Sequence, residues 1–236
     1  MRPCPLIRER FGFPVKGLLF ILHRMNYEVM PLGPYQANCS VLWDDPAQAW
    51  IVDPGADSAA VLGFMAKRGL QAGLVVLTHC HFDHISALGD ILVKFPVPVV
   101  MHADDVDFAF SSYNVMPPYR QTPRPASLVT DKRDGDALSC GGLTARIIHT
   151  PGHTPGGWCL FFEKERMLVA GDTLFAGSVG RTDLPGGDEA AMDASLKKLK
   201  ALPDDTRVIC GHGPQTTIGT EKQTNPYLRG GSVGGW

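Results

Sequence analysis

Short apolar runs recur along the chain, and glycine, proline or polar residues separate them. Runs of this length that are rich in β-branched and aromatic residues are typical of β-strands. The predicted strands are Tyr27–Leu32, Ser40–Trp43, Trp50–Val52, Leu74–Leu77, Val97–Met101, Thr144–Ile148, Trp158–Phe162, Met167–Ala170 and Arg207–Cys210.

Longer segments between these runs carry apolar residues at helical spacing. The segment Ser58–Arg68 follows Asp57, a suitable N-cap, and stops at Gly69. Ile85–Phe95 and Asp188–Ala201 show the same periodicity, and the lysines of the latter fall on its outward face. Strand hairpins mixed with helices predict an α/β domain built of layered, mixed sheets.

The two ends of the chain lack this regular pattern. Residues 1–24 are expected to be a dispensable extension, because their apolar run Leu18–Leu22 is too short to cross a bilayer and no signal-peptide cleavage pattern follows it. A membrane anchor is the alternative interpretation. The catalytic domain is expected to span residues 25–229, and the glycine-rich residues 230–236 are expected to be flexible.

Composition narrows the class of protein. Of 236 residues, 44% are hydrophobic and 19% are charged, which is typical of a globular chain rather than a disordered one. The net charge of -2 offers no basic surface for nucleic acid, so neither a nucleic-acid nor a membrane partner is expected. The six cysteines form no C-x-x-C pair, which favours reduced thiols and a cytoplasmic location.

The run T-H-C-H-F-D-H follows a buried-strand pattern and is the sharpest chemical signal. Residues two apart in an extended segment point to the same side, so His79 and His81 can bind one ion together. A turn into the next helix would direct Asp83 and His84 toward a second ion. Imidazole nitrogens and a carboxylate suit zinc or another borderline first-row metal, with iron or manganese as alternatives.

Further polar residues follow three other predicted strands. His153 lies in T-P-G-H-T-P-G, Asp172 in A-G-D-T-L-F and His212 in C-G-H-G-P. Each alone could be an ordinary turn or surface residue. Together with the first cluster they predict one site at the ends of the strands, where a rigid sheet positions functional side chains.

Seven candidate ligands exceed the four that one tetrahedral ion takes, so two divalent ions are predicted. Asp172 would bridge the ions, because a carboxylate has two oxygens, and a hydroxide between them would be the nucleophile. The expected catalytic residues are Asp83 and Asp172. One ion is assigned to His79, His81 and His153, and the other to Asp83, His84 and His212.

These motifs, with G-R-T-D at 180–183 and N-P-Y-L at 225–228, resemble the metallo-β-lactamase fold hydrolases. The resemblance covers 25–229 and is nearest to small single-domain proteins similar to glyoxalase II (hydroxyacylglutathione hydrolase). It implies a four-layer αββα sandwich of two mixed sheets flanked by helices, a binuclear site at the sheet edges, and the same seven ligands. It also implies metal-assisted hydrolysis of a small-molecule thioester such as a hydroxyacylglutathione.

The chain departs from that family at its end, because only 24 residues follow His212. Full glyoxalase II proteins have a C-terminal helical region that binds glutathione. The proline-rich loop 108–127 is therefore hypothesised to form part of the substrate mouth, although a plain surface crossover explains it equally well. The candidate substrate-binding residues are Tyr113, Tyr119, Arg120, Arg124 and Arg181, although for Arg181 a pair with Asp183 that braces the turn after Asp172 is the favoured role.

Other interpretations stay open. An iron-dependent persulfide dioxygenase resembles the chain in T-H-C-H-x-D-H, T-P-G-H-T-P-G and G-R-T-D, and would place one iron on His79, His153 and Asp172. A β-lactamase role is weaker, because those enzymes usually have cysteine where Asp172 stands. A non-catalytic metal-binding module is the alternative from another class. His102 and His149 are interpreted as ordinary histidines, and oligomeric state is not predicted.

Overall fold

The computed structural model of the protein describes residues 25–231. The predicted extension, residues 1–24, lies outside the described residues, as does most of the predicted tail, 232–236. Within the described part, no helix is long and apolar enough to cross a membrane.

The first sheet has six strands in sequential order, β1-β2-β3-β4-β5-β6. Its first three strands form an antiparallel meander, and β3 through β6 run parallel. The edge strand β6 was not predicted, because two residues carry no readable alternation. The bounds are β1 Asn26–Leu32, β2 Ala37–Trp43, β3 Ala49–Val52, β4 Ala72–Val76, β5 Val99–Val100 and β6 Leu128–Val129.

The second sheet has the order β14-β13-β10-β9-β8-β7. Strands β7 to β10 form an antiparallel meander, β13 pairs with β10 in parallel, and β14 closes the edge. A small ribbon of β11 (Leu174–Phe175) and β12 (Ser178–Val179) lies apart from it. The sheet's strands are β7 Ala137–Cys140, β8 Leu143–His149, β9 Trp158–Phe162, β10 Met167–Gly171, β13 Arg207–Cys210 and β14 Thr216–Thr217.

Two of the three predicted helices form as expected. Helix α1 spans Ser58–Arg68 with Asp57 at its N-cap, and α5 spans Glu189–Lys200 after Asp188, whose side chain caps the backbone N–H of Ala191. The helix predicted over Ile85–Phe95 forms only over Leu88–Lys94, as α3, whereas Ile85 ends the separate short helix α2. The remaining bounds are α2 Phe82–Ile85, α3 Leu88–Lys94, α4 Val106–Ala109, α6 Ile218–Thr224, and 3₁₀ turns at Pro46–Gln48 and Ala103–Asp105.

The break between α2 and α3 is caused by a hydrogen bond to another part of the chain. The backbone N–H of Ala87 donates to the carbonyl of Pro54, 3.0 Å away, in the loop after β3, instead of continuing the helical ladder. The extra early turn, α2, starts within the histidine motif and places Asp83 and His84 on helical backbone. Helical backbone therefore begins at Phe82, three residues before the predicted helix start at Ile85.

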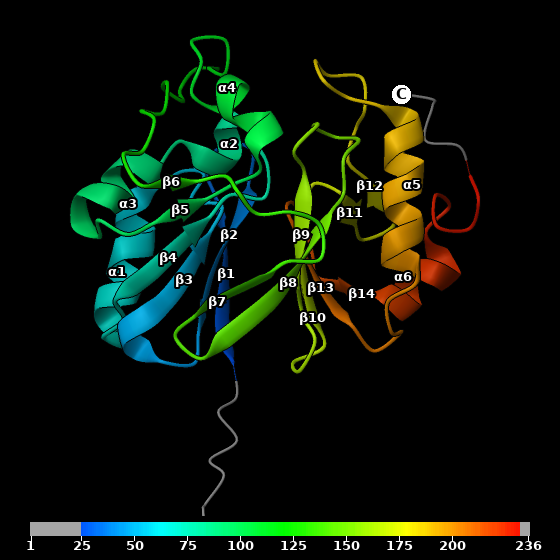
Figure 1. The fold of residues 1–236 in the computed structure, drawn as a ribbon, viewed down its shortest axis with the longest axis horizontal. Coiled ribbons are helices and arrows are strands. Elements are labelled where there is room, and N and C mark those ends of the chain that lie inside the picture. The colour runs from blue at the N-terminus through cyan, green and yellow to red at the C-terminus, as the bar shows by residue number, and fades with distance from the viewer. Residues whose placement is uncertain (1–24, 232–236) are drawn as a thin grey trace, which may run out of the picture.

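The two sheets lie face to face, with α1 and α3 outside the first and α5 and α6 outside the second (Figure 1). Apolar residues of both sheets form the central core, among them Trp50 and Val76 from the first and Ile147 and Leu160 from the second. Two outer cores lie beneath the helices. This is the predicted αββα sandwich.

Hydrogen bonds join the two sheets at the edge where the candidate ligands lie. The indole of Trp158 donates to the carbonyl of Leu77 at 2.8 Å, and the backbone N–H of Trp158 donates to the carbonyl of Thr78 at 3.0 Å. Asn38 donates from its backbone to Gly211 at 2.7 Å and from its side chain to Cys210 at 2.9 Å. The loops after β4 and β13 are thereby fixed relative to the opposite sheet.

Candidate metal centre

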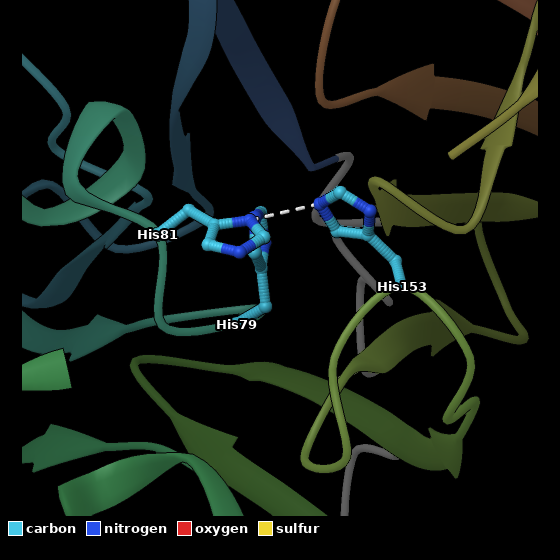
Figure 2. A group of neighbouring side chains, drawn as sticks. All are labelled: His79, His81 and His153. Carbon is cyan, nitrogen blue, oxygen red and sulfur yellow. Dashed lines mark hydrogen bonds between the residues drawn. The ribbon is translucent and has the colours of Figure 1, made fainter. Parts of the chain in front are cut away.

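The loop after β4 carries the first group of candidate ligands. His79 and His81 point from this loop toward His153, which comes from the loop between β8 and β9 in the other sheet (Figure 2). Nδ1 of His81 lies 2.9 Å from Nε2 of His153, and the rings of His79 and His153 are 5.1 Å apart. Ring nitrogens of all three residues are close enough together to hold one ion.

A second group lies beside the first. Helix α2 provides Asp83 and His84, and the loop after β13 provides His212. Nε2 of His212 lies 3.1 Å from Nε2 of His84 and 3.4 Å from Oδ2 of Asp83. These three residues also fit the spacing for one ion.

Asp172, in the loop after β10, lies between the two groups. Its Oδ2 is 3.4 Å from Nε2 of His153 and 3.5 Å from Nε2 of His212, while Oδ1 is 3.4 Å from Nε2 of His84. The carboxylate therefore contacts members of both groups, in the position expected of a bridging ligand. The side chains of all seven predicted ligands meet at this edge of the sandwich.

The protein holds the histidine rings by their other nitrogen. Nδ1 of His153 donates to the carbonyl of Arg181 at 2.7 Å, and Nδ1 of His212 donates to the carbonyl of Tyr35 at 3.0 Å. Nδ1 of His84 donates to the carboxylate of Asp53 at 3.2 Å. With Nδ1 engaged in this way, each Nε2 faces the cluster and is left as the nitrogen that could bind a metal ion, which is the usual arrangement of metal-bound histidines.

The site fits a cation because buried polar atoms in it lack partners. Nε2 of His79 and Oδ1 of Asp172 are buried without a hydrogen bond, which is costly unless a ligand satisfies them. Burial, and then the neighbouring His84, holds the pKa of His79 well below its ordinary value. Burial and His153 lower the pKa of His81 to about 3, so both rings are neutral and able to bind metal.

In the second group, the pKa values of the histidines are raised rather than lowered. Burial lowers the pKa of His84, but the carboxylates of Asp172 and Asp83 outweigh it and raise the pKa to about 10. The pKa of His212 is also raised, because its contact with Asp83 outweighs burial. The carboxylates that raise these two pKa values would also stabilise a bound cation.

The sequence did not identify Asp53, which lies under the centre with a φ of 52°. Its Oδ1 accepts from the backbone N–H of Thr78 at 2.7 Å, and its Oδ2 accepts from the hydroxyl of Thr78 at 2.6 Å as well as from His84. Aspartate is among the few residues that adopt this left-handed backbone readily, but the conformation is not readable from the sequence. Asp53 anchors both the histidine loop and one of its rings.

Asp105 was not predicted either, because its partners lie 49 and 51 residues away in the chain. This buried carboxylate accepts from the hydroxyl of Thr154 at 2.8 Å and from the backbone N–H of Gly156 at 2.7 Å, on either side of the turn after His153. A Cβ at Gly156 would collide with this carboxylate. The second T-P-G of the motif thus has a packing role.

The predicted substrate residues occupy different environments. Tyr119 is buried, with its ring 5.8 Å from Tyr35 and 5.1 Å from Phe82. Tyr113, Arg120 and Arg124 are exposed on the loop after α4. The guanidinium of Arg181 forms two 2.6 Å bonds to the carboxylate of Asp183, so it is Arg181's backbone carbonyl that contacts the centre.

The histidines interpreted as ordinary lie apart from the seven. His102 and His149 stack on each other with ring centres 4.2 Å apart, and Nε2 of His149 lies 3.0 Å from the carbonyl of Pro155. With Asp104 they form a further group close enough to hold an ion. Their near-parallel rings, inclined by 6°, direct the ring nitrogens along separate planes, which does not favour a shared ion. Cys80 is buried in the core of the first sheet.

Comparison with known proteins agrees with this geometry. Residues 32–212 match the family described as the metallo-beta-lactamase superfamily. The chain is 35% identical over 208 residues to "Hydroxyacylglutathione hydrolase GloC" of Haemophilus influenzae, covering 86% of this chain and 98% of that protein.

Solved structures agree as well. The BLEG-1 B3 metallo-beta-lactamase has a TM-score of 0.80 at 38% identity, covering 87% of this chain and all 100% of that one. TTHA1623, solved in a di-iron-bound form, has a TM-score of 0.70 at 35% identity, covering 85% and 100%. With the αββα sandwich and the metal-binding histidine and aspartate clusters at its edge, these matches show that the chain belongs to the metallo-beta-lactamase superfamily.

Proposed function

We propose that this protein is a binuclear-metal hydrolase of thioesters. The observation that carries the proposal is Asp172, whose two oxygens contact His84 of one ligand group and His153 of the other. Two three-residue groups joined by one carboxylate provide ligands for two ions rather than one. The 35% identity to GloC of Haemophilus influenzae supports a thioester as the substrate class.

The first ion is assigned to His79, His81 and His153, the second to Asp83, His84 and His212, with Asp172 shared. Two bound divalent ions would supply a water of lowered pKa and a positive charge beside the reacting carbonyl. Zinc is the proposed metal, with iron or manganese as alternatives, and the di-iron-bound relative shows that iron occurs in this fold.

The chain's own groups prepare the site for this chemistry. Burial raises the pKa of Asp83, but His84 and His212 outweigh it and hold the pKa well below its ordinary value. Asp83 therefore stays ionised at neutral pH and can orient a water through its carboxylate. In the reaction, water adds to the thioester carbonyl carbon, the carbon–sulfur bond breaks, and the thiol leaves with a proton from that water.

Metal content and hydrolysis test this proposal together. Protein reconstituted separately with zinc, iron and manganese should hold about two ions per chain. It should hydrolyse S-lactoylglutathione or a neutral thioester, with thiol release as the readout. Chelation should abolish turnover, and the metal that was removed should restore it. A fully loaded protein that hydrolyses no thioester would overturn the proposal.

A second candidate function is a mononuclear iron persulfide dioxygenase. It is favoured by the close approach of His79, His153 and Asp172, the positions that such an enzyme would use for one iron. Oxygen uptake with glutathione persulfide, together with one iron per chain, would select it. Thioester hydrolysis with two ions and no oxygen uptake would select the hydrolase.

A further inference from the structure

Exposed large apolar side chains gather at one place on the described surface. Tyr35 is 45% exposed, Tyr113 87%, Val115 38% and Met116 45%, and we name these four residues the apolar rim. Among the described residues one other large apolar side chain is exposed, Val93 on α3. Clustered apolar exposure of this kind commonly marks a binding surface.

Hydrogen bonds connect the apolar rim to the metal centre. The backbone carbonyl of Tyr35 accepts from Nδ1 of His212 at 3.0 Å, and the hydroxyl of Tyr35 donates to the sulfur of Met116 at 2.6 Å. Asn114, between Tyr113 and Val115, donates from its side chain at 2.7 Å to the carbonyl of Cys80, which separates two candidate ligands. Both segments of the rim are thus attached to the loops that carry the ligands.

Aromatic side chains extend this apolar surface to the candidate ligands themselves. The ring of Phe108 lies 6.3 Å from that of His81, edge to face. The ring of Phe175 lies 6.0 Å from that of His212, also edge to face. A substrate that reaches the ions would therefore meet apolar groups beside both ligand groups.

Two arginines of this region, Arg181 and Arg120, make no hydrogen bond or ring contact with the rim residues. Arg181, whose backbone contacts His153, pairs its guanidinium with Asp183. Arg120 lines a separate hollow of about 740 Å³ that also contains Asp57 and Asp90. In the described part of the chain, the hydrogen bonds and ring contacts of the rim residues involve no lysine or arginine. The rim residues themselves therefore offer no cationic partner to a thiol that carries carboxylates.

We infer that the apolar rim binds the organic chain of an uncharged, apolar thioester in preference to a thioester of an anionic tripeptide thiol. This rests on the proposed function, because it names the substrate class of the same site. The rim removes apolar surface of the substrate from water, so catalytic efficiency rises with the length of the acyl chain.

The test compares neutral thioesters of one thiol that differ in acyl chain. Zinc-loaded protein is assayed with the acetyl and hexanoyl thioesters of N-acetylcysteamine and with S-lactoylglutathione. We expect kcat/KM for hexanoyl to exceed that for acetyl by about tenfold or more, since burial of each added methylene strengthens binding. We also expect the hexanoyl ester to be hydrolysed more efficiently than S-lactoylglutathione.

Two variants test whether the apolar rim causes the dependence of kcat/KM on acyl-chain length. In V115S/M116S the ratio of hexanoyl to acetyl kcat/KM should fall toward one, whereas Val93→Ser, an equally apolar surface change on α3, should keep the ratio. Calorimetry with the hexanoyl amide analogue gives a readout without turnover. Its binding to the parent should show a negative heat-capacity change, and this change should shrink in V115S/M116S.

The outcomes separate the two proposals. Thioester hydrolysis with no dependence on chain length, or with S-lactoylglutathione preferred, would overturn the rim inference and leave the hydrolase standing. A chain-length ratio that V115S/M116S leaves unchanged would also overturn it. A loaded protein with no activity on any of the three esters would overturn the proposed function, and this inference with it.

Discussion

Nδ1 of His84 donates a hydrogen bond to Oδ2 of Asp53 across 3.2 Å, in the buried floor of the candidate metal centre. The same carboxylate oxygen accepts from the hydroxyl of Thr78, one residue before the first candidate ligand. One carboxylate that binds no ion in the proposed scheme thus orients a ligand of the second group and anchors the loop of the first.

We expect Asp53→Asn to weaken metal binding. An amide nitrogen facing Nδ1 of His84 favours the tautomer with its proton on Nε2, which removes the lone pair needed for the ion. Asparagine tolerates the positive φ at this position, so the backbone is kept. Affinity at the second site should fall by about 10- to 100-fold. Competition with a chromogenic chelator measures it, with Asp90→Asn, a surface carboxylate bonded to Ser58, as the control.

Asp172→Ala should remove metal and hydrolysis together. The carboxylate contacts His84, His153 and His212, so its loss affects both ion positions. Activity should drop by at least about a hundredfold. Elemental analysis and thiol release are measured on the same preparation, beside Asp183→Ala as a nearby exposed carboxylate. Full turnover by Asp172→Ala would contradict the bridging role.

Metal binding should release protons, and affinity should fall as the solution becomes more acidic. The pKa of His84 is raised to about 10, so in the metal-free protein this ring is protonated at pH 7, and the pKa of His212 is shifted in the same direction. A cation must displace the proton of His84. Calorimetric titration with zinc at pH 7 in buffers of different ionisation enthalpy gives the number released. A heat that is independent of the buffer would contradict this prediction.

Asp105→Ala should destabilise the protein by leaving the hydroxyl of Thr154 and the N–H of Gly156 without their acceptor. The cost of such buried unpaired donors is about 1–3 kcal/mol each. Urea unfolding of the metal-free protein measures it. Asp104→Ala, the neighbouring and largely exposed carboxylate, serves as the control and should change stability much less.

The sequence predicts much of this fold because several elements carry a complete local signal. Helix α1 and strands β9 and β13 have the predicted bounds, since their apolar spacing and end residues agree. Two-residue strands such as β6 and β14 arise from tertiary pairing and leave no pattern to detect. The break before α3 depends on a bond from Ala87 to Pro54, which local periodicity does not contain.

The candidate site, like the fold, could be predicted from the sequence only in part. The candidate ligands follow strands, so their convergence could be predicted from the chain alone. Asp53 and Asp105 act through partners 25 to 51 residues away, and their environment exists only in the folded chain. The apolar rim likewise depends on two distant segments, as the bond between Tyr35 and Met116 shows.

Each candidate ion position draws ligands from both sheets, and its last member in the chain comes from the second sheet. A nascent chain that has completed only the first sheet therefore holds half of each site and cannot retain an ion in either. The second position lacks one of its ligands until His212, which follows β13, has taken its place. We therefore expect metal to bind only after both sheets have formed, and ions at these positions would link the two halves of the sandwich.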